Sequence, residues 1–335
     1  MKVLVCGGAG YIGSHTVVEL VNGGHDVVIL DNFSNSDPEV LNRLETITGK
    51  KIPFIEMDIR DPRIDGVFKE NAFDSVIHFA ALKAVGESVS QPLKYYDVNV
   101  AGTVHLLEAA LRNEVGGFVF SSSATVYGDP DSVPLTEESP LRTVNPYGVT
   151  KLMCEQILQD VASANPQLKI AILRYFNPVG AHESGLIGED PNDIPNNLMP
   201  FVSQVAVRRR EKLSVFGSDY PTHDGTGVRD FIHVVDLASA HLAALNALEN
   251  NDKIVVNVGT GKGYSVLDLV KAFEKVNGVT IPYELVSRRP GDAAECYADP
   301  SLAEQVIGWK AARGIDDMCR DTWKWQSMNP GGYKS

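Results

Sequence analysis

A chain of 335 residues, 44% hydrophobic and 22% charged, has enough length for one large domain or two unequal ones around a buried core. Its formal net charge of −13 argues against a surface for nucleic acid or an anionic membrane, so an anionic ligand needs a few well-placed cations. The cysteines (Cys6, Cys154, Cys296 and Cys319) lie far apart, which predicts neither a metal site nor a disulfide framework and favours a reducing compartment. With no apolar run of membrane-spanning length and no room for a cleavable signal, we expect a cytoplasmic protein.

Short runs rich in valine, isoleucine and phenylalanine recur through the first half and alternate with helical patterns. These runs show little alternation of polar and apolar residues, which is typical of strands covered on both faces. The pattern predicts an α/β fold with a Rossmann-type, doubly wound parallel sheet, whose ligand crevice lies at the carboxyl ends of the strands. The predicted strands cover residues 2–5, 26–30, 53–56, 75–78, 117–120 and 170–173, and helices are expected at 14–22 and 103–113.

Beyond residue 178 the pattern is less regular. Segments 180–197 and 217–227 are rich in glycine, proline, asparagine and aspartate, which indicates long connections between fewer elements. We therefore predict a first domain at residues 1–178 and a smaller, mixed α/β C-terminal lobe at 179–335. The run 253–258 has the composition of a further strand, so we expect an interleaved boundary, with residues 230–262 returning to the first domain.

A glycine-rich turn follows the first predicted strand and opens the first predicted helix. Gly7, Gly10 and Gly13 would let backbone N–H groups approach a pyrophosphate at the positive end of the helix. Asp31 ends the second strand, 18 residues after Gly13, where a carboxylate would bond the adenosine ribose and repel a ribose 2′-phosphate. The spacing therefore predicts NAD rather than NADP in the first domain. Asp58, after the third strand, suits either a contact to the adenine amino group or a helix cap.

A second motif opens the helix after the fifth strand. Asn145 and Pro146 suit its N-cap and its first position. Tyr147 and Lys151 then lie four residues apart and share one helix face. A phenol, with an ordinary pKa of about 10, is a poor base at neutral pH, but a lysine ammonium and a nicotinamide cation would both lower that pKa. Together with Ser123, which follows the fifth strand, the pair predicts a proton-transferring centre.

The Tyr-x-x-x-Lys pair, the upstream serine and the Gly-x-x-Gly-x-x-Gly turn resemble the extended short-chain dehydrogenase/reductase family. Within it, longer stretches across nearly the whole chain are similar to the UDP-glucose 4-epimerases. The chain departs from many members at Val149 and Thr150, where lysine and serine are usual, and at Cys6, where threonine is usual. Both Tyr147 and Lys151 are present. The similar stretches are residues 8–15, 78–88, 121–128, 173–178, 188–191, 194–200, 225–230 and 323–326.

The resemblance implies an isomerase that interconverts UDP-galactose and UDP-glucose through a transient ketone at sugar carbon 4. It implies that Tyr147 takes the proton of the 4-hydroxyl, that Ser123 shares this hydrogen bond, and that Lys151 holds the nicotinamide ribose. NAD is regenerated in each cycle and can stay bound. The family's cofactor contacts correspond to Gly7, Gly10, Tyr11, Ile12, Gly13, Asp31, Asn32, Asn35, Asp58, Ile59, Phe79, Ala80, Lys83, Asn99 (or its neighbour Val98), Ser123, Tyr147, Lys151 and Phe176.

The resemblance also implies a substrate site. Arg229 and Arg289 match arginines that bind the diphosphate, for which guanidinium is well suited, although either alone also fits a surface ion pair. Cys296 occupies the position of a pocket-wall residue that is tyrosine in members restricted to the two plain sugars, so UDP-GalNAc and UDP-GlcNAc are expected as further substrates. Homodimers form in this family through two helices per subunit, here those after Leu93 and after Tyr147. The other expected substrate contacts are Ser123, Tyr147, Tyr175, Asn177, Asn197, Leu198, Val215, Phe216 and Asp292.

Two other functions are considered. A nucleotide-sugar 4,6-dehydratase of the same family needs an additional acid and base, typically an Asp-Glu pair beside the catalytic threonine. Here Ala124 and Thr125 follow Ser123, and neither is an acid or base at neutral pH. A non-catalytic NAD-binding sensor has no need of a tyrosine base, yet Tyr147 and Lys151 are both present.

Overall fold

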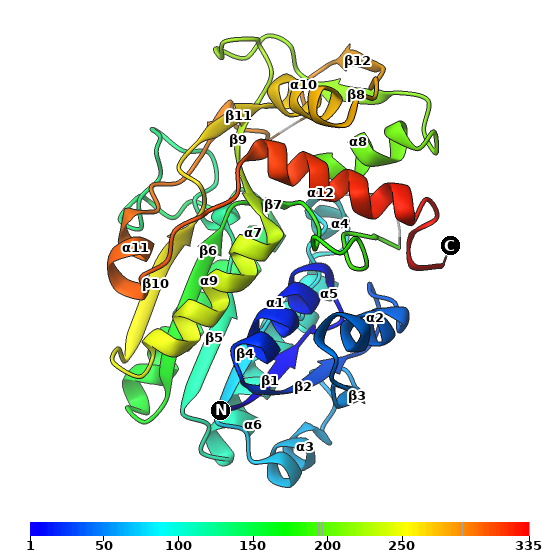
Figure 1. Ribbon diagram of the computed structural model, residues 1–335. Helices are drawn as coiled ribbons and strands as arrows, with labels where there is room; N and C mark the ends of the chain where they lie inside the picture. The colour runs from blue at the N-terminus through cyan, green and yellow to red at the C-terminus, as the bar shows by residue number, and fades with distance from the viewer. Residues whose placement is uncertain (193–194, 196, 290, 335) are drawn as a thin grey trace.

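The computed structural model describes residues 1–192, 195, 197–289 and 291–334, so residues 194 and 196 of the similar stretch 194–200 lie outside the described residues. Its centre is a seven-stranded sheet in the order β10-β6-β5-β4-β1-β2-β3, and all neighbouring strands are parallel (Figure 1). This order confirms the expected doubly wound sheet. The strands are β1 (Lys2–Cys6), β2 (Asp26–Asp31), β3 (Phe54–Glu56), β4 (Ser75–His78), β5 (Gly117–Ser121), β6 (Lys169–Tyr175) and β10 (Lys253–Val258).

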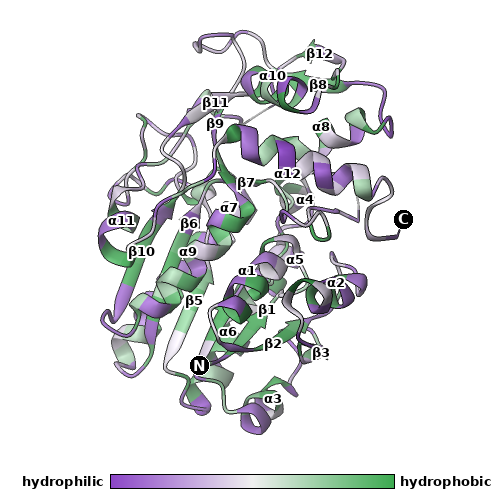
Figure 2. Cartoon of the chain, in the orientation of Figure 1, coloured by the Kyte–Doolittle hydropathy of each residue, from purple (hydrophilic) through white to green (hydrophobic). Residues whose placement is uncertain are grey.

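Helices cover both faces of this sheet because successive side chains of a strand point to opposite faces. On β1, Val3 and Val5 pack in one apolar core, and Leu4 and Cys6 pack in another. Figure 2 shows hydrophobic residues along these strands. The first core is closed by α1 (Tyr11–Asn22), α2 (Glu39–Thr48) and α9 (Val234–Ala247), and the second by α3 (Ile64–Asn71), α6 (Gly102–Arg112) and α7 (Pro146–Ala164).

A smaller mixed α/β lobe lies beyond the carboxyl ends of the large sheet, at the top of Figure 1. In one of its sheets β9 pairs with β7, β11 and β13, and in the other β8 pairs with β12. Its core contains Leu213, Phe231 and Phe273. Its elements are β7 (Asn177–Val179), α8 (Leu198–Ala206), β8 (Leu213–Phe216), β9 (Val228–His233), β11 (Gly263–Ser265), α10 (Val266–Asn277), β12 (Tyr283–Val286), β13 (Glu295–Cys296) and α12 (Ile315–Met328).

The chain passes between the two parts more than once. After β9 in the small lobe, α9 packs on α1, and β10 pairs with β6 in the large sheet. β10 has the bounds expected for the strand at 253–258. The numerical division at residue 178 stays a prediction. The remaining elements are α4 (Val85–Ser90), α5 (Pro92–Tyr95), the π-helix η1 (Tyr96–Ala101), the 3-10 turns η2 (Ala124–Val126) and η3 (Gly332–Lys334), and α11 (Ser301–Ile307).

Differences from the expected elements are small and local. Helix α1 begins at Tyr11, three residues before the expected start, because Gly10 in the glycine turn is already its N-cap. Strand β6 runs to Tyr175, two residues beyond the expected end, because β10 pairs with it as far as the bridge between Val258 and Tyr175. Within the described residues, no helix has the length and apolar character needed to cross a membrane.

Candidate active site

A cavity of about 420 Å³ opens where β1, β2 and β4 end, at the edge where a doubly wound sheet binds its ligand. Its lining includes Gly7 after β1, Asp31 at the end of β2 and Phe79 after β4. Its far wall is formed by Tyr175 and residues 188–191. This volume lies within the range of about 300–1,000 Å³ that is usual for small-molecule and cofactor sites.

The glycine turn forms a cradle in which a side chain has no place. Gly7 has φ +77°, and a Cβ atom there would stand 2.7 Å from the backbone nitrogen of Ala80. Gly13 is in contact with the carbonyl oxygen of Gly7, so a Cβ is excluded there too. Gly10 caps α1 without a side-chain hydrogen bond, which leaves the N-terminus of the helix facing the cavity. These features fit a pyrophosphate group.

Asp31 lies at the position expected for a ribose-binding carboxylate. It accepts hydrogen bonds from the backbone N–H groups of Ala9 (3.0 Å) and Phe33 (2.9 Å) and from the hydroxyl of Ser36 (2.9 Å). Arg43, the nearest arginine downstream in sequence, points elsewhere: its Nη1 donates to the carbonyl of Leu186 at 2.9 Å. The carboxylate at Asp31, without the Arg43 guanidinium beside it, fits NAD rather than NADP.

Asp58 lines the same cavity and caps no helix, since α3 begins later, at Ile64. Arg60 donates to both carboxylate oxygens of Asp58 at 2.8 Å, and Asn32 donates to one at 2.9 Å. The hydrogen bond from Arg60 is the main cause that lowers the pKa of Asp58 to about 2. The helix-cap role is therefore excluded for Asp58, and the contact to the adenine amino group remains as the prediction.

The hydroxyl and ammonium groups of the second motif meet at one end of this cavity. Asn145 caps α7 by accepting a hydrogen bond from the N–H of Gly148 at 2.8 Å, as the sequence predicts. Tyr147, on the first turn of α7, lies beside the side chains of Ser123 and Tyr175. One turn later, Lys151 donates from Nζ to the carbonyl of Ser121 at 2.8 Å. The helix cap and the end of β5 therefore fix the three groups relative to one another.

Burial acts in opposite senses on the two titrating groups. It lowers the pKa of Lys151 to about 8, because an ammonium loses hydration in this site. It raises the pKa of Tyr147 well above its ordinary range, and the neighbouring Tyr175 phenol adds to that effect. The sequence predicts a lowered pKa for Tyr147, whereas in the protein without cofactor burial outweighs that effect and raises the pKa.

Most of the expected cofactor residues meet in this one cavity. Asn99 does not line it, because its amide bonds the backbone of Leu82 and the hydroxyl of Thr150, and Val98 lines the cavity instead. Ser123, which follows β5, does not line the cavity either, and Phe176 is buried in a separate apolar cluster. The expected residues that line the cavity are Gly7, Gly10, Tyr11, Ile12, Gly13, Asp31, Asn32, Asn35, Asp58, Ile59, Phe79, Ala80, Lys83, Tyr147 and Lys151.

The expected substrate residues fall into small groups in the C-terminal lobe. Arg289 forms an ion pair with Asp292 (2.9 Å), and its guanidinium lies 4.9 Å from the centre of the Phe216 ring. These three residues form an exposed polar and aromatic group. The side chain of Val215 is instead buried in the core of the lobe, so a contact from this residue has to use its backbone.

Cys296 and Arg229 are partners in register on β13 and β9. Cys296 packs against the cluster that contains Phe176, and so does Ala124, which directly follows Ser123. Burial raises the pKa of the Cys296 thiol to about 11, so the thiol is neutral. Asn177 begins β7, and Asn197 and Leu198 open α8, where Asn197 donates to Glu189 at 2.8 Å.

Several residues that line the cavity have no role predicted from the sequence, among them Glu189, Asp190 and Tyr333. Glu189 pairs with Lys83 at 3.1 Å, across more than 100 residues of sequence. The similar stretch 188–191 contains Glu189 and Asp190 and was a signal for them. Tyr333 had no such signal, because only the tertiary fold brings it to the cavity.

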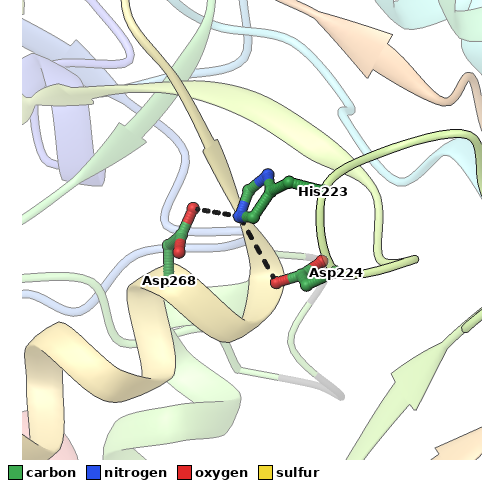
Figure 3. Close-up of side chains that lie close together, drawn as sticks. All are labelled: His223, Asp224 and Asp268. Atoms are coloured by element: carbon green, nitrogen blue, oxygen red, sulfur yellow. Dashed lines mark ion pairs between the residues drawn. The ribbon is translucent and has the colours of Figure 1, made fainter.

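A different ionisable group lies outside the cavity (Figure 3). His223 lies 3.2 Å from Asp268 on α10 and 3.7 Å from Asp224, and the three are close enough to hold a metal ion. Asp224 already accepts hydrogen bonds from Thr226 (2.9 Å from its N–H), and Asp268 accepts one from the N–H of Ser265. The hydroxyl of Ser265, the N-cap of α10, also donates to Asp224 at 2.5 Å, and this bond and the His223–Asp268 pair attach the loop before β9 to α10. The expectation that the chain has no metal site stays a prediction.

Comparisons with known proteins agree with this geometry. The model of the NAD dependent epimerase/dehydratase family matches residues 3–259. The UDP-glucose 4-epimerase of Pasteurella multocida is 61% identical over 337 residues, which cover 100% of both chains. The crystal structure of UDP-glucose 4-epimerase from Bifidobacterium longum in complex with NAD+ and UDP is 54% identical, with a TM-score of 0.96 over 99% of this chain and 100% of that one. The UDP-Glc/GlcNAc 4-epimerase from Campylobacter jejuni is 40% identical, with a TM-score of 0.85 over 98% and 99% of the two chains. The chain therefore belongs to the NAD dependent epimerase/dehydratase family, and its cofactor is NAD.

Proposed function

We propose that the protein interconverts UDP-galactose and UDP-glucose by transient oxidation at sugar carbon 4. The observation that carries this proposal is the group formed by Tyr147, Ser123 and Lys151 at one end of a cavity shaped for a dinucleotide. The full-length similarity to UDP-glucose 4-epimerases supports the same reaction. The enzyme is thus an isomerase.

In this proposal Tyr147 is the base that accepts the proton of the 4-hydroxyl and later returns it. Ser123 lies beside the phenol, and its hydroxyl accepts from the Thr125 N–H at 3.2 Å, which fixes its position. A sugar hydroxyl placed beside both groups therefore meets an aligned acceptor. Lys151 would bind the nicotinamide ribose, and its ammonium favours the charged phenolate one helical turn away.

NAD, when bound, takes up the hydride from carbon 4 and returns it to the ketone, so the reaction needs no external oxidant. The cation of its nicotinamide ring would supply positive charge near Tyr147. That charge is needed, because burial alone holds the phenol in its protonated form. The base is therefore active only in the loaded enzyme.

The UDP part of the substrate is assigned to the small lobe. Arg229 and Arg289 would bind the diphosphate, with Phe216, Asp292, Asn177, Asn197 and Leu198 around it. Arg289 is about half exposed and, among the charged residues that the structure describes, pairs with Asp292 alone, so its remaining donors can turn to phosphate oxygens. Tyr175, beside Tyr147, would contact the sugar.

We also propose that the enzyme accepts UDP-GalNAc and UDP-GlcNAc. Cys296 packs against the apolar cluster that Ala124, next to Ser123 in sequence, also contacts, and a tyrosine ring there would take up more space. A thiol leaves space for an N-acetyl group that a close-packed wall would exclude. The Campylobacter jejuni protein, with this fold, is a UDP-Glc/GlcNAc 4-epimerase.

A 4,6-dehydratase is disfavoured because Ala124 and Thr125 follow Ser123 and supply no carboxyl group. The test of the epimerase is incubation of purified protein with UDP-galactose and no added oxidant. We expect UDP-glucose to form without accumulation of free NADH. Loss of water to a 4-keto-6-deoxy product would identify a dehydratase, and no turnover of any of the four UDP-sugars would favour the non-catalytic sensor.

The homodimer is a further proposal, supported by an apolar surface on α4, α5 and α7, which pack together. Leu93 is 81% exposed on α5, Val89 is 64% exposed on α4, and Met153 is exposed on α7. Such a patch on a monomer is unusual and suits a second copy of the chain. Light scattering should give twice the chain mass, and Leu93→Glu should shift it to the monomer.

We place the enzyme in the cytoplasm, in line with its free cysteines.

A further inference from the structure

The C-terminal segment, residues 329–334, is part of the wall of the cofactor cavity. After α12 ends at Met328, the chain turns back, and η3 (Gly332–Lys334) lies beside α2, at the right of Figure 1. Tyr333 lines the cavity and is only 8% exposed. A side chain from the small-lobe end of the sequence therefore faces the glycine turn of the large sheet.

Tyr333 holds the loop 188–191, which has no helix or strand of its own. The Tyr333 hydroxyl donates to the carbonyl of Gly188 at 3.2 Å and accepts from the Gly188 N–H at 3.2 Å. The backbone N–H of Tyr333 donates to the carboxylate of Asp190 at 2.8 Å. One residue thus makes three hydrogen bonds to this loop, and every residue of the loop lines the cavity.

The same loop is fixed on its other side by residues assigned to ligand binding. Glu189 accepts from Nζ of Lys83 at 3.1 Å and from Nδ2 of Asn197 at 2.8 Å. Lys83 follows β4 in the large sheet, and Asn197 caps α8 in the small lobe. The loop therefore spans the cavity between the two parts of the molecule.

Tyr333 is itself held by aromatic and cationic neighbours. Its ring centre lies 4.7 Å from that of Trp325 on α12, and the Arg43 guanidinium lies 5.0 Å from it. Arg43, on α2, also donates to Asn329 at 2.7 Å. These contacts explain why Arg43 is turned away from Asp31, and they attach the C-terminal segment to the large-sheet domain.

We propose that Tyr333 and loop 188–191 form a clasp that retains NAD in the cavity, with the Tyr333 hydroxyl as its positioning group. The inference rests on the proposed placement of NAD in this cavity. Release of the dinucleotide requires movement of the wall, and that movement breaks the bonds between Tyr333 and Gly188. An enzyme whose cofactor is restored in every turnover gains from slow release, since an empty cavity is inactive.

The test measures how fast bound dinucleotide leaves the holoenzyme. Purified protein is diluted into cofactor-free buffer, separated by rapid gel filtration at successive times, and denatured, and its NAD and NADH are quantified by chromatography. Tyr333→Phe removes the two bonds to Gly188 and keeps the ring. Each hydrogen bond shifts the equilibrium between the closed and the open cavity wall by roughly two- to tenfold toward the closed form. Because NAD leaves through the open form, we expect Tyr333→Phe to release it at least about threefold faster. Tyr333→Ala should accelerate it further.

Tyr283 provides matched controls, because it is 46% exposed on β12 and does not line the cavity. Tyr283→Phe and Tyr283→Ala should release dinucleotide at the wild-type rate. An unchanged rate in Tyr333→Phe overturns the clasp, whether or not Tyr333→Ala folds. Wild-type protein that contains no dinucleotide as purified and binds none when it is added would instead refute the placement of NAD in this cavity.

Discussion

Removal of one partner from the buried ion pair between Arg174 and Glu155 should destabilise the protein strongly. Arg174 on β6 and Glu155 on α7 are 4% and 1% exposed. The guanidinium donates to both carboxylate oxygens, with Nη2 at 2.7 Å and Nε at 3.1 Å. Glu155 also accepts from the hydroxyl of Ser122 at 2.5 Å. Ser122 lies in sequence between Ser121, which accepts from Lys151, and Ser123, which lies beside Tyr147.

The magnitude follows from the burial. Arg174→Met leaves a charged carboxylate without its partner in the interior, a change that costs about 3–5 kcal/mol. For a chain of this length, the unfolding entropy near the midpoint is about 0.7 kcal/mol per kelvin, so a loss of about 4 kcal/mol corresponds to a fall in Tm of about 6 °C. Replacement of both residues by methionine removes both charges and should recover at least about half of that loss.

The assay is chemical unfolding with NAD kept at saturation, on wild type, both single variants and the double variant. Arg142→Met is the matched control, because Arg142 pairs with Asp131 at 2.7 Å but both side chains are more than half exposed. That variant should lose less than about 1 kcal/mol. A double variant whose loss equals the sum of the two single losses would refute the coupling on which the reasoning depends.

Three further predictions concern the reaction centre. Tyr147→Phe should keep the cofactor and the fold but lower turnover at least about 10²-fold, because the base is lost; near-normal turnover would exclude Tyr147 as the base. Cys296→Tyr should abolish turnover of UDP-GalNAc and keep that of UDP-galactose, and a wild type inactive on UDP-GalNAc would contradict the argument. Burial lowers the pKa of Lys151 to about 8, so between that pH and about 10.4 the unfolded chain binds more protons than the folded one. In unfolding experiments without cofactor, the stability of wild type relative to Lys151→Met should therefore rise with pH across this window, and a flat or falling difference would show that Lys151 is not buried as described.

The sequence by itself determined the local features of this protein. The parallel strands were predictable because strands buried on both faces consist of unbroken apolar residues, and β4 and β10 have the expected bounds. The glycine turn, Asp31 and the Tyr147–Lys151 pair were predictable because each depends on a short spacing within one strand, turn or helix. The resemblance then identified the reaction, but its cofactor role for Asn99 does not fit the structure, because the Asn99 amide hydrogen-bonds the carbonyl of Leu82 and the hydroxyl of Thr150.

Only the tertiary structure decided how distant segments share the cavity. Tyr333 and Gly188 are 145 positions apart, and no periodicity or spacing links them. The raised pKa of Tyr147 likewise depends on how completely the fold buries its phenol and on the neighbouring Tyr175. Hydrogen bonds and desolvation at such sites arise from packing between elements, whereas sequence patterns record mainly the hydrophobic and conformational preferences within each element.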